Sequence, residues 1–362
     1  GDPAAGAGAG LAAAFNAPLA GVIFCLEELH KNFSPLVLMA TVAAAVVSTA
    51  VAQVVFGGAP VFHMGVLPVV PLGSLYVLLI FLGAFVGALG LDFNTALQRA
   101  LDAYTRIPLP GWQKPAIPLL TAGILGFFLP EIMGGGNRLV DQLVTTDYSV
   151  IFLLLLFFGK FLFTMLCFGS GVPGGIFLPM LVLGALGGAV FAKGAVILGL
   201  LPPVYAVNFI VFGMAAYFAG VVKSPITGSV LIMEMTGSFQ HMLALICVSM
   251  AAYLVTDMAG GKPVYDMLLA RSLRLRAKIQ QALQHRRVVA EFTVGNGSSL
   301  AGCLVRDVEW PAHSLLVNVR RSDEEMVPAG DFQLQAGDYL YVLMDDLDIA
   351  GLQALAQERF QG

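Results

Sequence analysis

The chain has few charged residues, and this scarcity excludes most classes of soluble protein. Only 12% of its 362 residues are Asp, Glu, Lys or Arg, whereas soluble domains average about 25%. Hydrophobic residues make up 58% of the chain and its mean hydropathy is +0.83. The net charge of −4 carries little information, because the charges concentrate in the last quarter. We therefore expect a chain that lies mostly in membrane lipid and binds no nucleic acid.

Cysteine pairs and catalytic motifs are also absent. The sequence has no Cys-x-x-C pair, and its four cysteines are far apart, so neither a disulfide framework nor a zinc site is expected. His-Glu-x-x-His, Gly-x-Ser-x-Gly and paired intramembrane aspartates are missing, which argues against an intramembrane enzyme or a cofactor. The cluster Glu27, Glu28 and His30 lacks the His-x-x-x-His spacing of zinc proteases, so we predict no metal.

A glycine- and proline-rich break lies inside one of the most apolar stretches. Residues 170–179 read Ser-Gly-Val-Pro-Gly-Gly-Ile-Phe-Leu-Pro, and three glycines with two prolines cannot continue a membrane helix. A new helix is expected near Gly175, with unpaired N–H groups at its first turn, including those of Ile176 and Phe177. Such a turn is an uncharged anion site. The alternative is a purely structural helix break.

Apolar segments that could be helical run along the first three quarters of the chain. Several are too short to span a bilayer and are interrupted by Gly and Pro, which predicts discontinuous helices that meet at mid-membrane. The segments are 8–15, 17–29, 36–57, 66–100, 115–129, 149–168, 176–200, 204–221, 225–236 and 241–258.

An internal repeat indicates a duplicated transporter fold. Residues 17–21 (Ala-Pro-Leu-Ala-Gly) match residues 224–228 (Ser-Pro-Ile-Thr-Gly), 207 positions later, and in both copies a Glu follows nine residues after the Pro, at Glu27 and Glu234. The broken segment ends 46 residues before Pro225. Its counterpart would fall upstream of this chain, so we expect half of the ion pathway to lie in a missing segment and this fragment alone not to transport.

Polarity changes abruptly near residue 271, where a basic segment follows the last apolar helix. By the positive-inside rule this end is cytoplasmic. From Val288 the pattern becomes that of a soluble α+β domain, with strands at 288–294, 315–320 and 339–344, a turn at 336–338 and an amphipathic helix at 346–358. The predicted domains are 1–270 in the membrane, 271–287 as a basic linker, and 288–362 as a regulatory domain.

Three motifs together resemble the CLC family of chloride channels and proton-coupled chloride antiporters. They are Gly175-Ile176-Phe177-Leu178-Pro179, Gly261-Lys262-Pro263-Val264-Tyr265, and Asn16-Ala17-Pro18-Leu19-Ala20-Gly21 followed by Glu27-Glu28. The resemblance implies an all-helical, multi-pass domain with an inverted repeat and broken helices, in the cell membrane. It also implies a homodimer with one pore per subunit, contacting lipid. The family's Gly-Ser-Gly-Ile-Pro motif and the motif of its gating glutamate are not in this sequence.

The same resemblance assigns the site residues. Gly175, Ile176, Phe177 and Tyr265 would bind the anion, although a membrane tyrosine alone is more often an interfacial anchor. Glu28 would carry protons, because burial raises the pKa of a carboxyl and makes it able to exchange protons near neutral pH. The competing interpretation is a solvated helix end, since His30 and Lys31 follow.

Four more charged residues have other expected roles. Glu27 would be a hydrogen-bonding or proton-supplying neighbour of Glu28. Glu234, Lys160 and Lys223 are expected to be paired or snorkelling structural residues. The resemblance as a whole predicts chloride/proton antiport. The alternative, a passive chloride channel of the same family, usually has an uncharged residue at the position of Glu28.

Residues 287–345 resemble the TrkA-C regulatory domain. The resemblance rests on Leu334-Gln335-Ala336-Gly337-Asp338-Tyr339-Leu340 and on residues 294–302. It implies that a ligand controls ion transport, and a nucleotide or cyclic dinucleotide is the class expected. The small size of the domain favours pairing into a dimer. The alternatives are a passive assembly module, since no phosphate-binding glycine motif is evident, and a chain that is purely a sensor.

Overall fold

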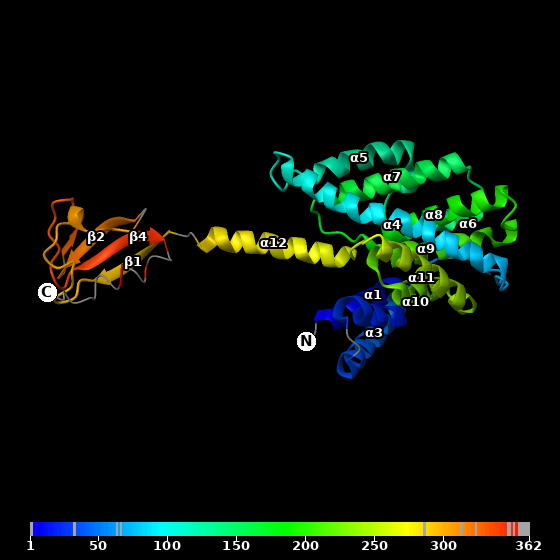
Figure 1. Ribbon diagram of the computed structural model, residues 1–362, viewed down its shortest axis with the longest axis horizontal. Coiled ribbons are helices and arrows are strands. Elements are labelled where there is room, and N and C mark those ends of the chain that lie inside the picture. Colours follow the sequence, from blue (N-terminus) through cyan, green and yellow to red (C-terminus); the bar gives the residue numbers. More distant parts are fainter. Residues whose placement is uncertain are drawn as a thin grey trace. The chain divides into compact units, whose positions relative to one another are not determined.

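The computed structural model describes residues 3–31, 34–62, 64–65, 67–284, 287–311, 314–322, 324–345, 349 and 352–353. The chain forms two compact units, Gly1–Met267 and Leu268–Gly362, each of which is described by itself (Figure 1). Six of the described helices are long and apolar enough to cross a membrane.

The first unit is helical throughout its described secondary structure, as expected. Its helices are α1 (Pro3–Phe15), α2 (Pro18–Phe24), α3 (Pro35–Phe56), α4 (Ser74–Arg106), α5 (Ala116–Phe128), α6 (Asn137–Thr145), α7 (Val150–Gly169), α8 (Phe177–Ile197), α9 (Ala206–Val222), α10 (Pro225–Thr236), α11 (Met242–Met258) and the start of α12 (Val264–Gln284). A π-helix, η1 (Cys25–His30), continues α2.

Each of the ten expected apolar segments overlaps one of these helices, although several boundaries differ. Helix α4 begins at Ser74 instead of residue 66, because Pro68, Pro71 and Gly73 precede it. The short helix α6 was not expected, since its many polar residues hide it from a search for apolar runs. The basic segment predicted as a linker is helical as far as Gln284, because α12 continues through it.

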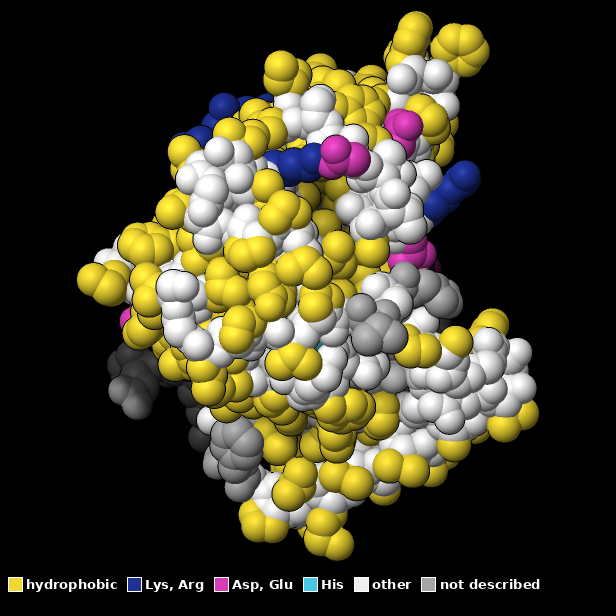
Figure 2. Space-filling model, turned by 90° about the vertical axis from the view of Figure 1, so that its right-hand side faces the viewer, with side chains coloured by type: hydrophobic (Ala, Val, Ile, Leu, Met, Phe, Trp, Pro, Cys, Tyr) yellow, Lys and Arg dark blue, Asp and Glu magenta, His cyan; other side chains and the backbone are white. Residues whose placement is uncertain are grey.

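Small residues allow the membrane helices to approach closely. A side chain on Gly184 of α8 would place its Cβ 2.5 Å from the carbonyl oxygen of Gly213 on α9, so the two backbones touch at this point. Close packing through glycine is the usual way in which helices associate in lipid. Outside the core, large apolar side chains such as Phe56, Phe127 and Met258 are exposed. Figure 2 shows one face on which hydrophobic side chains predominate and charged ones are few, as lipid requires.

The sequence repeat is a repeat of structure. Helices α2 and α10 both begin with a proline, and α3 and α11 begin 207 positions apart, the same offset as in the sequence. The residues two positions before each proline, Asn16 and Lys223, both have left-handed backbones, with φ of 48° and 66°. Helices α2 and α10 pack against each other, so the two copies meet at their matching segments.

The second unit contains a four-stranded antiparallel sheet in the order β1-β4-β2-β3. The strands are β1 (Arg287–Thr293), β2 (Leu315–Arg321), β3 (Glu324–Met326) and β4 (Tyr339–Asp345). The three expected strands are present, and the three-residue β3 was too short to predict. The helix expected at 346–358 lies outside the described residues apart from 349, 352 and 353.

The two faces of this sheet differ in burial. One face carries a core that includes Phe292, Val319 and Leu340. The opposite face has the row Val289–Leu343–Leu315 across three strands, and Val289 and Leu315 are exposed.

The turn before β4 depends on a buried carboxylate. Asp338 is 1% exposed and accepts two hydrogen bonds from Arg321, from Nε to Oδ1 and from Nη2 to Oδ2, each 2.8 Å long. Its Oδ2 also accepts from the N–H of Gln335 at 2.8 Å, which closes the turn. Burial by itself would raise the pKa of Asp338, but the hydrogen bonds from Arg321 and Gln335 outweigh it and hold that pKa below its ordinary value.

We expect Asp338→Ala to destabilise the second unit by about 2 kcal/mol, because it leaves a partly exposed Arg321 and a turn N–H unpaired. A depressed carboxyl pKa contributes stability that is complete above about pH 4 and is lost as the pH falls through the folded-state pKa. Hydrogen exchange of β4 in the full chain measures the loss. Asp331→Ala, at an exposed position, is the control, and equal exchange in both variants would contradict the assignment.

Candidate functional site

The chain between α7 and α8 is broken where the sequence predicted it. Helix α7 ends at Gly169, Gly171 has φ of +79°, and α8 begins at Phe177. The N–H groups of Ile176, Phe177 and Leu178 donate to no acceptor within the described chain. These three groups lie at the positive end of the α8 dipole. They can therefore hold an anion without a buried counter-charge.

A cavity of about 690 Å³ lies against this break. Its wall includes Gly175, Ile176 and Phe177 together with the side chains of Lys160 and Phe15. Lys160 is 1% exposed, and its Nζ donates to the carbonyl oxygens of Ile132 at 3.0 Å and Gly134 at 2.6 Å. The ammonium group thus pairs the free carbonyl groups near Gly134, and Lys160 also lines the cavity beside the break at residues 170–179.

Aromatic contacts connect both predicted anion-binding segments to the α1–α2 region. Phe177 stacks on Phe15 with ring centroids 4.7 Å apart. Tyr265, in the first turn of α12, meets Phe24 edge-on with centroids 5.8 Å apart. Phe15 and Phe24 belong to α1 and α2, and nothing in the sequence singled them out as contacts of this site.

The Glu28 side chain is buried, which contradicts the interpretation of a solvated helix end. It is 5% exposed and lies in the π-helix η1, a rare geometry that is frequent at functional sites. Its Oε2 accepts a hydrogen bond of 2.8 Å from the hydroxyl of Ser224, and its Oε1 has no partner among the described residues. Ser224 was not predicted as a site residue, because a serine before Pro225 has the sequence pattern of an ordinary helix cap.

Glu27 is fully engaged by the other repeat. Its Oε1 accepts from the N–H of Ile226 at 3.2 Å, and its Oε2 accepts from the N–H and the hydroxyl of Thr227 at 2.7 and 2.6 Å. It therefore caps the first turn of α10, where the proline at the first position has no N–H to offer.

The reciprocal interaction is made by the second repeat. Glu234 of α10 accepts from the N–H groups of Leu19 at 3.1 Å and Ala20 at 2.7 Å, and so caps α2. Each repeat supplies the carboxylate that caps the other. The expectation that Glu234 is a paired structural residue agrees with this geometry, and Lys223 likewise pairs with Asp257 at 2.8 Å.

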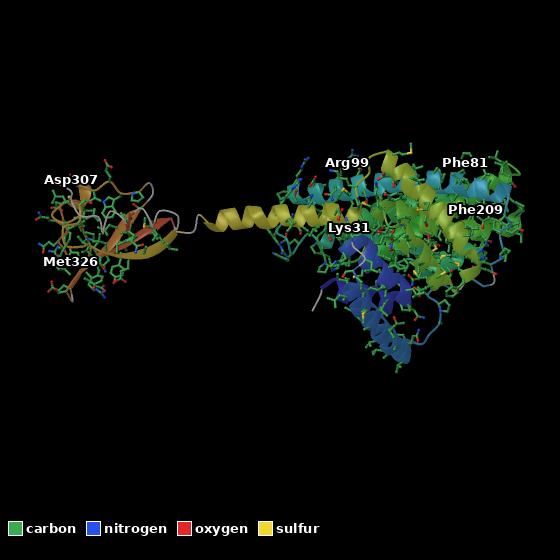
Figure 3. All side chains as sticks on the ribbon, turned by 60° about the horizontal axis from the view of Figure 1, so that its bottom comes forward. Lys31, Phe81, Arg99, Phe209, Asp307 and Met326 are labelled. Atoms are coloured by element: carbon green, nitrogen blue, oxygen red, sulfur yellow. The ribbon has the colours of Figure 1, made fainter. Side chains whose placement is uncertain are left out.

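An ion pair joins the segment predicted to carry protons to the segment predicted to bind the anion. Lys31, which directly follows η1 and is labelled in Figure 3, donates to Asp266 at 2.6 Å. Asp266 follows Tyr265 in the first turn of α12. Both side chains are about half exposed, so the pair contributes little to stability. Its effect is to connect the end of the Glu28 helix with the start of the Tyr265 helix.

Comparison with known proteins agrees with this architecture. Residues 4–257 match the family model described as voltage gated chloride channel, and residues 289–357 match the TrkA-C domain. The chain is 39% identical over 297 residues to the H(+)/Cl(-) exchange transporter ClcA of Citrobacter koseri, covering 80% of this chain and 62% of that protein. It is 38% identical over 289 residues to the ClcA of Vibrio parahaemolyticus, covering 77% and 61%.

Two solved structures are also similar. A slow cyanobacterial Cl-/H+ antiporter superposes with a TM-score of 0.67 at 33% identity, over 75% of this chain and 64% of that one. A CLC-type fluoride/proton antiporter gives a TM-score of 0.59 at 25% identity, over 69% and 61%. The chain spans about three fifths of the length of the curated relatives it matches. The match of one family model to most of its length shows that this chain belongs to the voltage-gated chloride channel (CLC) family and carries a TrkA-C domain.

Proposed function

We propose that the protein exchanges chloride for protons across the cell membrane as a secondary transporter. The observation that carries this proposal is the buried carboxylate of Glu28, hydrogen-bonded by a hydroxyl in a unit of apolar helices. Intramembrane carboxylates are costly and are typical of proton routes. The names of the similar proteins, which are proton-coupled exchangers, support the same conclusion.

The anion site of this proposal combines backbone and hydroxyl donors. The backbone around Gly175, Ile176 and Phe177 supplies oriented N–H groups, and Tyr265 supplies its O–H. A passive chloride channel is the second candidate. Glu28 argues against it, because a channel has no use for a buried proton carrier.

Further parts of the proposal concern assembly and orientation. The exposed apolar side chains of the helical unit suit contact with lipid and with a second copy of the chain. The basic residues of α12 favour a cytoplasmic C-terminal side by the positive-inside rule. They include Arg271, Arg274 and Arg276.

Replacing Tyr265 by Leu should weaken chloride binding about 10-fold, because a hydrogen bond to a charged partner is lost, and should loosen proton coupling. Calorimetric chloride titration and coupled-flux assays measure the two effects. Tyr148→Leu, where the ring packs on Phe152 instead, is the control. Wild-type affinity and coupling in Tyr265→Leu would remove that tyrosine from the site.

Glu28→Gln keeps the shape of the side chain and removes its proton. In proteoliposomes it should abolish chloride-driven proton movement while some chloride flux persists. Glu131→Gln, at a carboxylate lining a different cavity, is the control and should keep both fluxes. Proton movement at the wild-type rate in Glu28→Gln would make this residue structural and favour the channel.

We also propose that the TrkA-C domain acts as a ligand-controlled dimer clamp. Its exposed sheet face suits a second copy of itself, since the apolar row Val289–Leu343–Leu315 lies near a charged pair of opposite sign, Arg320 and Glu291, 3.6 Å apart. A small domain gains stability from such pairing. The class of ligand, a nucleotide or cyclic dinucleotide, rests on the resemblance to TrkA-C domains alone. Helix α12 would transmit the change, because Tyr265 lies at its start.

Deleting residues 287–362 from the full-length protein should change chloride flux at least about 2-fold and remove any response to added nucleotides. A sharper variant is Leu315→Glu, which places a charge on the exposed sheet face. Val327→Glu, also at an exposed apolar position, is its control. If deletion changes neither flux nor ligand response, and the isolated domain stays monomeric, the domain is a passive module.

A further inference from the structure

Ser224 occupies a helix-capping position but does not cap its helix. It precedes Pro225 at the start of α10, where a serine side chain would ordinarily accept an N–H bond from the first turn. Its side chain caps nothing in α10, and its Oγ donates instead to Oε2 of Glu28, 2.8 Å away. The hydroxyl is free to do so because Glu27 has already taken the N–H groups of Ile226 and Thr227.

At the positions equivalent to Ser224 and Glu28, the other copy of the repeat has no polar pair. At the repeat offset, Ala17 stands where Ser224 stands, and Met235 stands where Glu28 stands. The capping carboxylates Glu27 and Glu234 are common to both copies. The architecture therefore needs the two caps, whereas an apolar pair serves equally well at the adjacent positions. The hydroxyl and carboxylate of the first site are an addition that folding alone does not demand.

Burying the Ser224 hydroxyl and the Glu28 carboxylate costs free energy, because both groups lose their hydration. Ser224 is 0% exposed and Glu28 is 5% exposed. A buried polar pair has to repay the loss of its hydration. The only described hydrogen bond of the Glu28 carboxylate is the one from Ser224, so this bond fixes the orientation of the group. The second oxygen, Oε1, has no described partner and is left to bind a proton.

We propose that Ser224 is a positioning residue for proton transfer by Glu28. This inference rests on the proposed antiport function. A hydroxyl can donate to Oε2 of the carboxylate, and it can still donate to that oxygen when Oε1 carries the proton. Ser224 thus stays hydrogen-bonded in both states of Glu28, while the proton joins or leaves a Glu28 oxygen and Ser224 keeps its own. The pairing holds the carboxyl in one orientation through the cycle.

The test is a set of serine variants of the full-length protein in proteoliposomes. Ser224→Ala should lower chloride-driven proton flux about 10-fold, the effect of losing a hydrogen bond to a charged group. Ser224→Thr, which keeps the hydroxyl, should restore flux to within about 3-fold of wild type. Ser224→Cys, a weak donor of nearly the same size, should lie between them. Ser229→Ala is the matched control, since this buried hydroxyl of α10 bonds to the Pro225 carbonyl and should leave proton flux unchanged.

A double variant separates this inference from the proposed function. In a Glu28→Gln background, Ser224→Ala should cause no further change in chloride flux, because Ser224 acts through Glu28. Equal proton flux in Ser224→Ala and Ser229→Ala would overturn the role of Ser224 while leaving Glu28 in place. A loss in both Ser224→Ala and Ser224→Thr would overturn it too, since packing and not the hydroxyl would then matter. Proton flux that survives Glu28→Gln would instead refute the antiport proposal.

Discussion

A backbone N–H or C=O group cannot be left unpaired in lipid, and the organisation of this protein follows from that constraint. Its membrane unit is built from broken helices, so every break exposes such groups. Two breaks are closed by Glu27 and Glu234, each of which caps the helix of the other repeat. A third involves Lys160, which binds two carbonyl oxygens. The N–H groups at the start of α8 have no acceptor within the described chain, and that difference makes this turn available to an anion.

The same constraint explains why two adjacent glutamates have different environments. Glu27 is saturated by N–H and hydroxyl donors and completes the backbone of α10. Glu28 has one donor and one oxygen without a described partner. Both can turn toward α10 because the chain adopts a π-helix at this point. The carboxylate that caps α10 and the carboxylate that we propose to carry protons are therefore neighbours in the sequence.

Much of the fold could be predicted from the sequence because its causes are local. Apolar runs, prolines and the glycine-rich break set the helix boundaries, and the broken turn before Phe177 lies where residues 170–179 placed it. The repeat predicted that the segments of Glu27 and Glu234 correspond. The three-residue β3 was too short to predict, and α6 was missed because its many polar residues hide it from a search for apolar runs.

The contacts of the site could not be predicted, because they join residues far apart in the chain. Glu28 and Ser224 are separated by 196 positions, and Lys31 and Asp266 by 235. The burial of Glu28 likewise depends on α10. The sequence alone was therefore compatible with two interpretations of Glu28, a proton carrier and a solvated helix end. A comparison of the two repeats could have indicated the Ser224–Glu28 pair, because Ser224 and Glu28 are polar and the equivalent residues, Ala17 and Met235, are apolar.

The most direct test of chloride/proton exchange is whether a chloride gradient moves protons. Full-length wild-type protein would be reconstituted in proteoliposomes with equal pH on both sides, and external pH would be followed after a chloride gradient is imposed. We expect protons to move in the direction opposite to chloride, against the proton gradient that develops. Chloride flux that runs down its gradient with no proton movement would contradict this expectation and would make the protein a passive channel.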